Sequence, residues 1–156
     1  MRLDVPLLEQ SFPYTCGLVS LDAICQYFQK RVSFQEHYSL CIKHKGLSIA
    51  HLAQIALEEG LLLDVFDGTK DDLLSSSYSF DQLRSSFSNT AIPIVFLDWS
   101  CIENNSSFQG HFVPVVGFEE DAVLVHHEST AFFRIPTTVF LDAWSRTGKS
   151  CIYVFK

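Results

Sequence analysis

The segment CGLVSLDAICQYFQ, residues 16–29, decides how the N-terminal part of the chain folds. Its apolar residues recur at helical spacing, for example at Val19 and Ala23, and a second apolar row lies beside them, as in a buried helix. Two further segments, 33–44 and 48–59, also have helical character, and the second has the clearest apolar periodicity in the chain. The first part of the chain is therefore predicted to be helical.

Residues suited to helix ends mark where these segments begin and stop. Ser48 is expected to be the N-cap of the segment 48–59, and Gly60 is expected to end it. Ser33 is the N-cap candidate for the segment 33–44, and Thr15 is the expected cap before Cys16.

From residue 61 onward the pattern changes to short apolar runs that are bounded by turn signals. Short helices are expected at about 80–88 and 137–145, and polar loops at Ser75–Ser77 and Asn104–Ser107. Helices followed by antiparallel strands predict an α+β domain, and 156 residues are expected to form one domain, 1–156. The expected strands are Leu61–Phe66, Ile92–Asp98, His111–Phe118, Ala122–His127, Phe132–Ile135 and Cys151–Phe155.

Charge and hydropathy argue against several classes of partner. Eleven Lys and Arg against eighteen Asp and Glu give a net charge of −7, and the basic residues form no block, so nucleic acid is not an expected partner. No apolar run reaches ~18 residues, so no membrane helix is expected. An acid and a proline stand within the first six residues, where a signal peptide would be apolar. We therefore expect a cytoplasmic protein, and its oligomeric state is left open.

Cysteine and histidine spacing predicts no metal site. The five cysteines are widely spaced and include no C-x-x-C pair, which favours a reducing compartment over a disulfide framework. His37, His44 and His51 recur every seven residues, but Gly46 and Ser48 interrupt the helix between the second and the third. We interpret this spacing as coincidence, and no metal or other cofactor is expected.

Cys16 is the candidate nucleophile. It opens the first helix, where unsatisfied N–H groups favour a thiolate over a thiol, and Gly17 beside it allows a substrate to approach the backbone. A structural cysteine in the first helical turn is the alternative.

Two polar residues could assist such a nucleophile. Gln10 lies six residues before Cys16 in an apolar segment, and its amide could form an oxyanion hole with the Cys16 N–H; the alternative is an exposed polar residue. His111 enters a very apolar strand after Gly110, which is costly without a task or a partner. A core histidine with its hydrogen bonds satisfied is the alternative there.

The arrangement of these residues resembles a known family. Gln10–x5–Cys16-Gly17, followed later by a Gly110-His111-Phe112-Val113 strand, resembles the papain-like cysteine peptidases. It is most similar to the double-glycine leader peptidases, which are the bacteriocin-processing domains of export transporters, and to their stand-alone relatives. Further similar segments extend over nearly the whole chain: Leu47–Leu61, Ile92–Trp99, His111–His127, Val139–Ser145 and Ile152–Phe155.

The resemblance implies a fold and an activity. The fold would be papain-like, with N-terminal helices packed on a C-terminal antiparallel sheet. The activity would be a thiol peptidase acting on a peptide or isopeptide bond of a peptide or protein substrate. Cys16 would attack, His111 would act as general base and then acid, and Gln10 would bind the oxyanion.

The chain departs from the family pattern in three places. Thr15 stands where an Asp often precedes the cysteine, and Pro114 interrupts the histidine strand, which must then be an edge strand or lack a ladder bond there. Where the family has an acid followed by proline, this chain has His127 and Glu128.

The third catalytic member is therefore uncertain between His127, Glu128 and Asp98. Strand alternation puts His127 on the face that meets His111, which favours His127 as its partner. The missing acid also keeps a non-catalytic peptide-binding module of the same fold as an alternative function. A deamidase or acyltransferase that uses the same Cys-His pair is another alternative.

Overall fold

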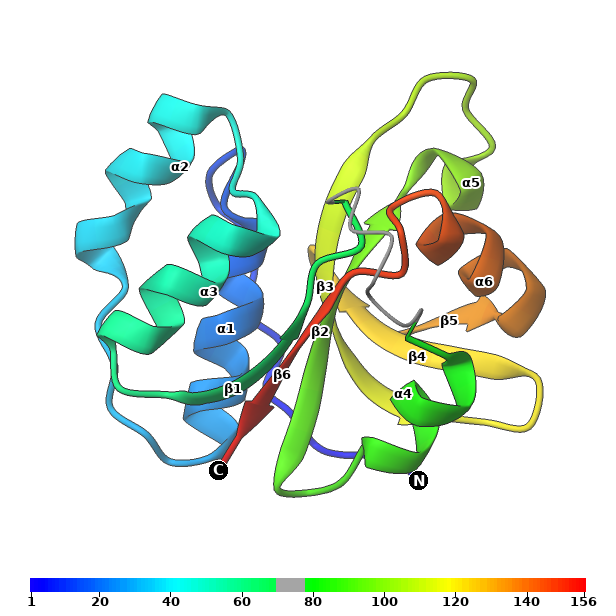
Figure 1. Ribbon diagram of the computed structural model, residues 1–156, viewed down its shortest axis with the longest axis horizontal. Helices are drawn as coiled ribbons and strands as arrows, with labels where there is room; N and C mark the ends of the chain where they lie inside the picture. The colour runs from blue at the N-terminus through cyan, green and yellow to red at the C-terminus, as the bar shows by residue number, and fades with distance from the viewer. Residues whose placement is uncertain (70–77) are drawn as a thin grey trace.

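A computed structural model describes residues 1–69 and 78–156, so the loop expected at Ser75–Ser77 lies outside the described residues. The described residues form a six-stranded antiparallel sheet in the order β1-β6-β2-β3-β4-β5 (Figure 1). The α+β prediction is confirmed. The strands are β1 (Leu62–Phe66), β2 (Ala91–Asp98), β3 (Gly110–Phe118), β4 (Ala122–His127), β5 (Thr130–Pro136) and β6 (Cys151–Phe155).

Helices lie on both sides of this sheet. Figure 1 shows the three N-terminal helices together on one side, where α1 contacts β2 and β3. On the other side, α6 contacts β2, β4 and β5. The N-terminal helices therefore pack on the sheet as predicted, and a C-terminal helix covers the opposite face. The helices are α1 (Cys16–Tyr27), α2 (Tyr38–His44), α3 (Ile49–Glu58), α4 (Phe80–Ser86), α5 (Ser100–Glu103) and α6 (Thr137–Ser145), with a 3-10 turn η1 (Gln35–His37).

The core on the α1 side follows from the stripe seen in the sequence. Leu18, Leu21 and Ile24 of α1 are fully buried, and so are Ile92 and Ile94 of β2. Burying a side chain of this size stabilises the fold by about 1.5–3 kcal/mol, so this contact fixes α1 firmly against the sheet.

Side-chain capping agrees with the prediction at α3 but not at the other two helices. The Ser48 hydroxyl accepts from the His51 N–H at 3.1 Å, and the His51 ring accepts from the Ser48 N–H, which forms a capping box. Thr15 is the N-cap residue of α1, as expected, but its side chain makes no capping bond: its hydroxyl donates to the Phe12 carbonyl at 2.7 Å instead. The cap expected from Ser33 is wrong, because η1 begins after Phe34.

Two other details differ from the prediction. The segment 33–44 divides into η1 and α2, because a 3-10 turn replaces the first turn of the expected helix. The short helix α5 lies before the expected polar loop at Asn104–Ser107 and was not predicted. At four residues it is too short to show a periodic pattern.

Pro114 lies in an internal strand, not at an edge. It pairs with Ile94 of β2, and the pairing of β3 with β4 extends over Val115–Phe118, so it begins just after Pro114. Proline has no N–H to donate, and the pairs between β3 and β4 do not include Pro114.

The seven-residue histidine spacing brings no three histidines together. His37 bonds to Glu59 at 2.9 Å, whereas His44 and His51 stack with their ring centroids 4.4 Å apart. Within residues 1–69 and 78–156 no group of three or more potential metal ligands occurs, and no helix is long and apolar enough to cross a membrane.

The two main chains at Gly68 and Gly148 lie against each other. A Cβ built on Gly148 would lie 2.1 Å from the Gly68 carbonyl oxygen, and Gly148 also has a φ of +70°. Gly60 has a similar φ of +75°, but a Cβ there would meet nothing within 4 Å. Substituting each glycine by alanine therefore separates the free-energy cost of the left-handed backbone conformation from the cost of the overlap with a neighbouring main chain.

We predict that Gly148→Ala destabilises the fold more than Gly60→Ala. Both variants should lose about 1–2 kcal/mol of unfolding free energy, because a residue with a side chain is strained in the left-handed conformation. Gly148→Ala should lose about 1–3 kcal/mol more, because its Cβ would overlap the Gly68 main chain. Urea unfolding of the two variants and the parent measures the difference. Equal losses would contradict the close approach of the two main chains.

Candidate active site

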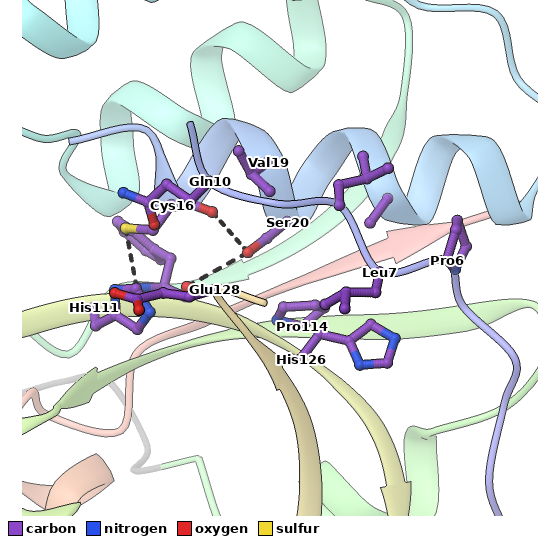
Figure 2. A pocket seen from close by; sticks show the side chains of 13 residues that line it. Pro6, Leu7, Gln10, Cys16, Val19, Ser20, His111, Pro114, His126 and Glu128 are labelled. Carbon is purple, nitrogen blue, oxygen red and sulfur yellow. Dashed lines mark hydrogen bonds between the residues drawn. The ribbon is translucent and has the colours of Figure 1, made fainter. Parts of the chain in front are cut away.

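Cys16 lies where α1 meets β3. It is the first residue of α1 and is partly exposed. Its sulfur accepts a hydrogen bond from the Phe112 N–H at 3.4 Å, as the dashed line in Figure 2 shows. The nucleophile candidate is therefore held against the strand that carries the base candidate.

Ser20 joins the same two elements one turn further along α1. Its buried hydroxyl lies 2.7 Å from the Cys16 carbonyl oxygen and 3.5 Å from the Phe112 carbonyl oxygen. A hydroxyl has one hydrogen, and the shorter contact is the i−4 bond typical of serine in a helix. Ser20 was not predicted as a site residue, because this bond has meaning only once β3 lies alongside α1.

His111 is paired with His127. Its Nε2 lies 3.0 Å from His127 Nδ1, and the two residues come from the neighbouring strands β3 and β4. The Trp99 ring stacks on His127 with centroids 4.0 Å apart and meets His111 edge-on at 5.1 Å. Since Nε2 of His111 is occupied by His127, Nδ1 remains for a proton from the nucleophile.

The three candidates for the partner of His111 have distinct positions. Asp98 is buried, and its Oδ1 accepts from the N–H groups of Ser100 and Gln109 and from the Ser100 hydroxyl. It therefore anchors the start of α5. Glu128 is exposed and lies 3.9 Å from His127 Nε2, so it borders the pair without replacing His127 in it.

Burial disfavours the charged forms of both Cys16 and His111. It raises the pKa of the Cys16 thiol, although the N–H groups of Phe112, Gly17 and Cys16 act in the opposite direction. Burial, followed by the nearby His127, lowers the pKa of His111 to about 4. The sequence led us to expect a stabilised thiolate. The helical N–H groups are present and lower the pKa of the thiol, but burial has the larger effect and raises it.

Gln10 reaches the same cavities from the N-terminal segment. This segment follows β3, since Arg2 pairs with Gly117 and the Leu3 N–H donates to the Val116 carbonyl at 2.8 Å. The Gln10 amide donates to the Phe12 carbonyl at 3.1 Å. Its side chain lines both of the cavities that Cys16 lines.

Two cavities of different size meet at Cys16 and His111. The wide one, of about 840 Å³, extends between the loop after α2, with Lys45 and Leu47, and the region of Phe108. The narrow one, of about 20 Å³, lies among small and apolar side chains, several of which Figure 2 labels. Its main lining residues are Pro6, Leu7, Val19, Ser20 and Pro114.

Solved structures share this fold. A C39-like peptidase from Bacillus anthracis matches with a TM-score of 0.73 and 14% identity, covering 98% of this chain and 95% of that chain. The double-glycine motif protease of an AMS/PCAT transporter, solved with its leader peptide, matches with a TM-score of 0.69 and 18% identity over 99% and 94%. The peptidase domain of Streptococcus ComA, a bifunctional ABC transporter of a quorum-sensing pathway, matches with a TM-score of 0.66 and 14% identity over 97% and 98%.

The sequence itself also matches a family. No curated protein matches the chain. The sequence model of the peptidase C39 family, in contrast, matches residues 4–149 and so includes every residue of the site. The chain therefore belongs to the peptidase C39 family of cysteine peptidases.

Proposed function

We propose that the protein hydrolyses peptide bonds with Cys16 as nucleophile and His111 as general base and then general acid. The observation that carries the proposal is the contact between His111 Nε2 and His127 Nδ1, since it leaves the opposite nitrogen of His111 for the thiol. Both groups line the same two cavities. Covalent catalysis by a cysteine needs a base beside the thiol that is itself oriented by a third group, and the shared cavities and the His127 contact support that assignment.

The neutral resting pair determines the order of proton movement. As the Cys16 sulfur bonds to the carbonyl carbon, its proton passes to His111 Nδ1, and the carbonyl oxygen becomes an oxyanion. The N–H of Cys16 and the Gln10 amide stabilise that oxyanion. His111 then gives the proton to the leaving amine, and water attacks the thioester with His111 again as base.

The two cavities support a substrate with a small residue at the cleaved bond. The narrow pocket of about 20 Å³ has room for little more than one water molecule. The wide cleft of about 840 Å³ accommodates several residues of an extended chain. One structural neighbour is a double-glycine motif protease that binds a leader peptide. We propose a peptide with small residues at the cleavage site as substrate.

A non-catalytic peptide-binding module is the competing proposal. It is favoured by His127, because an imidazole stabilises an imidazolium less well than a carboxylate does. Hydrolysis of a peptide with a Gly-Gly site by the parent, lost in Cys16→Ala while peptide binding is kept, would exclude it. Binding without hydrolysis by the parent would favour it.

We predict that Gln10→Ala lowers kcat by ~10²–10³ with little change in KM, because an oxyanion donor acts mainly in the transition state. Gln109→Ala is the matched control, since Gln109 also lines the wide cleft and its observed bonds to Asp98 and Trp99 use only its main chain. Steady-state kinetics on the Gly-Gly peptide measure both variants. Equal losses in both, or full turnover in Gln10→Ala, would remove Gln10 from the oxyanion hole.

We predict that iodoacetamide alkylates Cys16 at least ~10-fold faster than Cys101, because His111 takes the proton as the sulfur reacts. Cys101 is the matched control, since it is also partly exposed, whereas the other three cysteines are buried. His111→Gln should remove the difference. Mass spectrometry of the labelled peptides measures each rate.

The pH dependence of this reaction tests whether His111 assists the thiol. Because burial lowers the pKa of His111 to about 4 and raises that of Cys16, the form with a neutral His111 and a thiol keeps a nearly constant population between about pH 5 and 8, so the alkylation rate should be nearly constant there and fall at lower pH. A rate that rises about tenfold per pH unit over this range would show that only free thiolate reacts, without help from His111. A Cys16 rate no higher than that of Cys101 would contradict the role of His111.

A further inference from the structure

Glu128 occupies an unusual position beside the site. It follows β4 directly, in a two-residue turn between the paired residues His127 and Thr130, and has a φ of +50°. A left-handed conformation is costly for a residue with a side chain, and glycine or asparagine is usual in such turns. Figure 2 shows the Glu128 side chain next to His111 among the residues that line the narrow pocket.

The contacts of His127 determine which of its nitrogens carries the proton. In the resting site, His111 Nδ1 must be free to accept from Cys16, so the proton of His111 lies on Nε2. That N–H donates to His127 Nδ1 at 3.0 Å. His127 then carries its own proton on Nε2, the atom that lies 3.9 Å from the Glu128 carboxylate. The tautomer that the pair requires thus has its proton on the nitrogen that lies 3.9 Å from Glu128.

We propose that Glu128 is a positioning residue that holds His127 in the Nε2–H tautomer and supplies negative charge when His111 becomes protonated. The inference rests on the proposed function in assigning proton transfer to His111. His127 accepts from His111 but brings no charge of its own. Glu128 supplies that charge from one residue further along the chain.

Few other charged groups near His127 could supply this negative charge. His111 of β3 faces it on one nitrogen, Trp99 and Phe133 cover its ring, and the acids near it are Glu128 and, on α5, Glu103. Glu128 has the larger effect of the two on the pKa of His127, and both raise it against the lowering caused by burial. Glu103 is engaged by the Asn105 amide at 3.1 Å. Glu128 is therefore the acid to test and Glu103 its control.

The first experiment compares Glu128→Gln with Glu103→Gln on the Gly-Gly peptide. Glu128→Gln keeps the size of the side chain and removes its charge, so kcat should fall about 3- to 10-fold with KM little changed. Losing the carboxylate also lowers the pKa of His127, so the acid limb of the kcat profile should move to lower pH. Glu103→Gln should leave kcat unchanged and shift the limb less. Equal kcat in Glu128→Gln and the parent would overturn the proposal.

A second experiment needs no activity. Nitrogen NMR of protein with isotope-labelled histidine reports which ring nitrogen carries the proton. The parent should show His127 protonated on Nε2, and Glu128→Gln should show a mixture of tautomers, whereas Glu103→Gln should resemble the parent. His127 protonated on Nδ1 in the parent, or no response to Glu128→Gln, would overturn the proposal.

The two experiments separate this inference from the proposed function. A protein without peptidase activity whose His127 tautomer depends on Glu128 would contradict the proposed hydrolysis and support the positioning role. An active enzyme whose kcat, acid limb and tautomer ignore Glu128 would support the hydrolysis and overturn the positioning role.

Discussion

The contact between the start of α1 and β3 is the constraint on which the site depends. The Phe112 N–H bonds the Cys16 sulfur, and the Ser20 hydroxyl lies between the carbonyls of the same two residues. Leu18, Leu21 and Ile24 fix the helix on the sheet beneath these polar bonds. Because His111 directly precedes Phe112 in β3, the packing that buries the helix also sets the position of the base relative to the thiol.

The same packing determines the charge state of the site. Removing Cys16 and His111 from water penalises their charged forms, so burial raises one pKa and lowers the other. The mechanism proposed above therefore moves a proton from Cys16 to His111 during the reaction. In that mechanism the partner of His111 has its main effect when the imidazolium forms, and His127, with Trp99 stacked on it, lies against His111.

Much of the fold could be predicted because its signals are local. The apolar stripe of α1, the Ser48 cap and the strands β4 and β6 follow from periodicity and from residues near in sequence. The capping bond expected from Thr15 could not be predicted in this way, because its hydroxyl donates to the Phe12 carbonyl in the preceding loop. The 3-10 turn before α2 and the four-residue α5 have no periodic signal to detect.

The positions of the candidate site residues were easier to predict from the sequence than their hydrogen bonds and pKa shifts. Strand alternation was enough to predict that His127 lies beside His111. Asp98 instead accepts hydrogen bonds from the N–H groups of Ser100 and Gln109, which come near it only in the folded loop. The pKa of the Cys16 thiol depends on how far the fold buries it, and this burial is a property of the tertiary structure. Ser20 gave no signal because its second neighbour is 92 residues away in sequence.

The neutral Cys-His pair has a consequence for the choice of inhibitors. The reaction of an alkylating reagent would be assisted only by the removal of the thiol proton by His111. Such a displacement develops no negative charge near Gln10 or the first turn of α1, so the oxyanion donors would not assist it. Aldehydes and nitriles add reversibly to a thiol and place a developing negative charge where the carbonyl oxygen of a substrate would lie. Mounted on a peptide that enters the wide cleft and ends in a residue small enough for the narrow pocket, such groups would use the proton transfer and the oxyanion donors together. On the proposed mechanism, the site therefore favours reversible, transition-state-like inhibitors over simple alkylating agents.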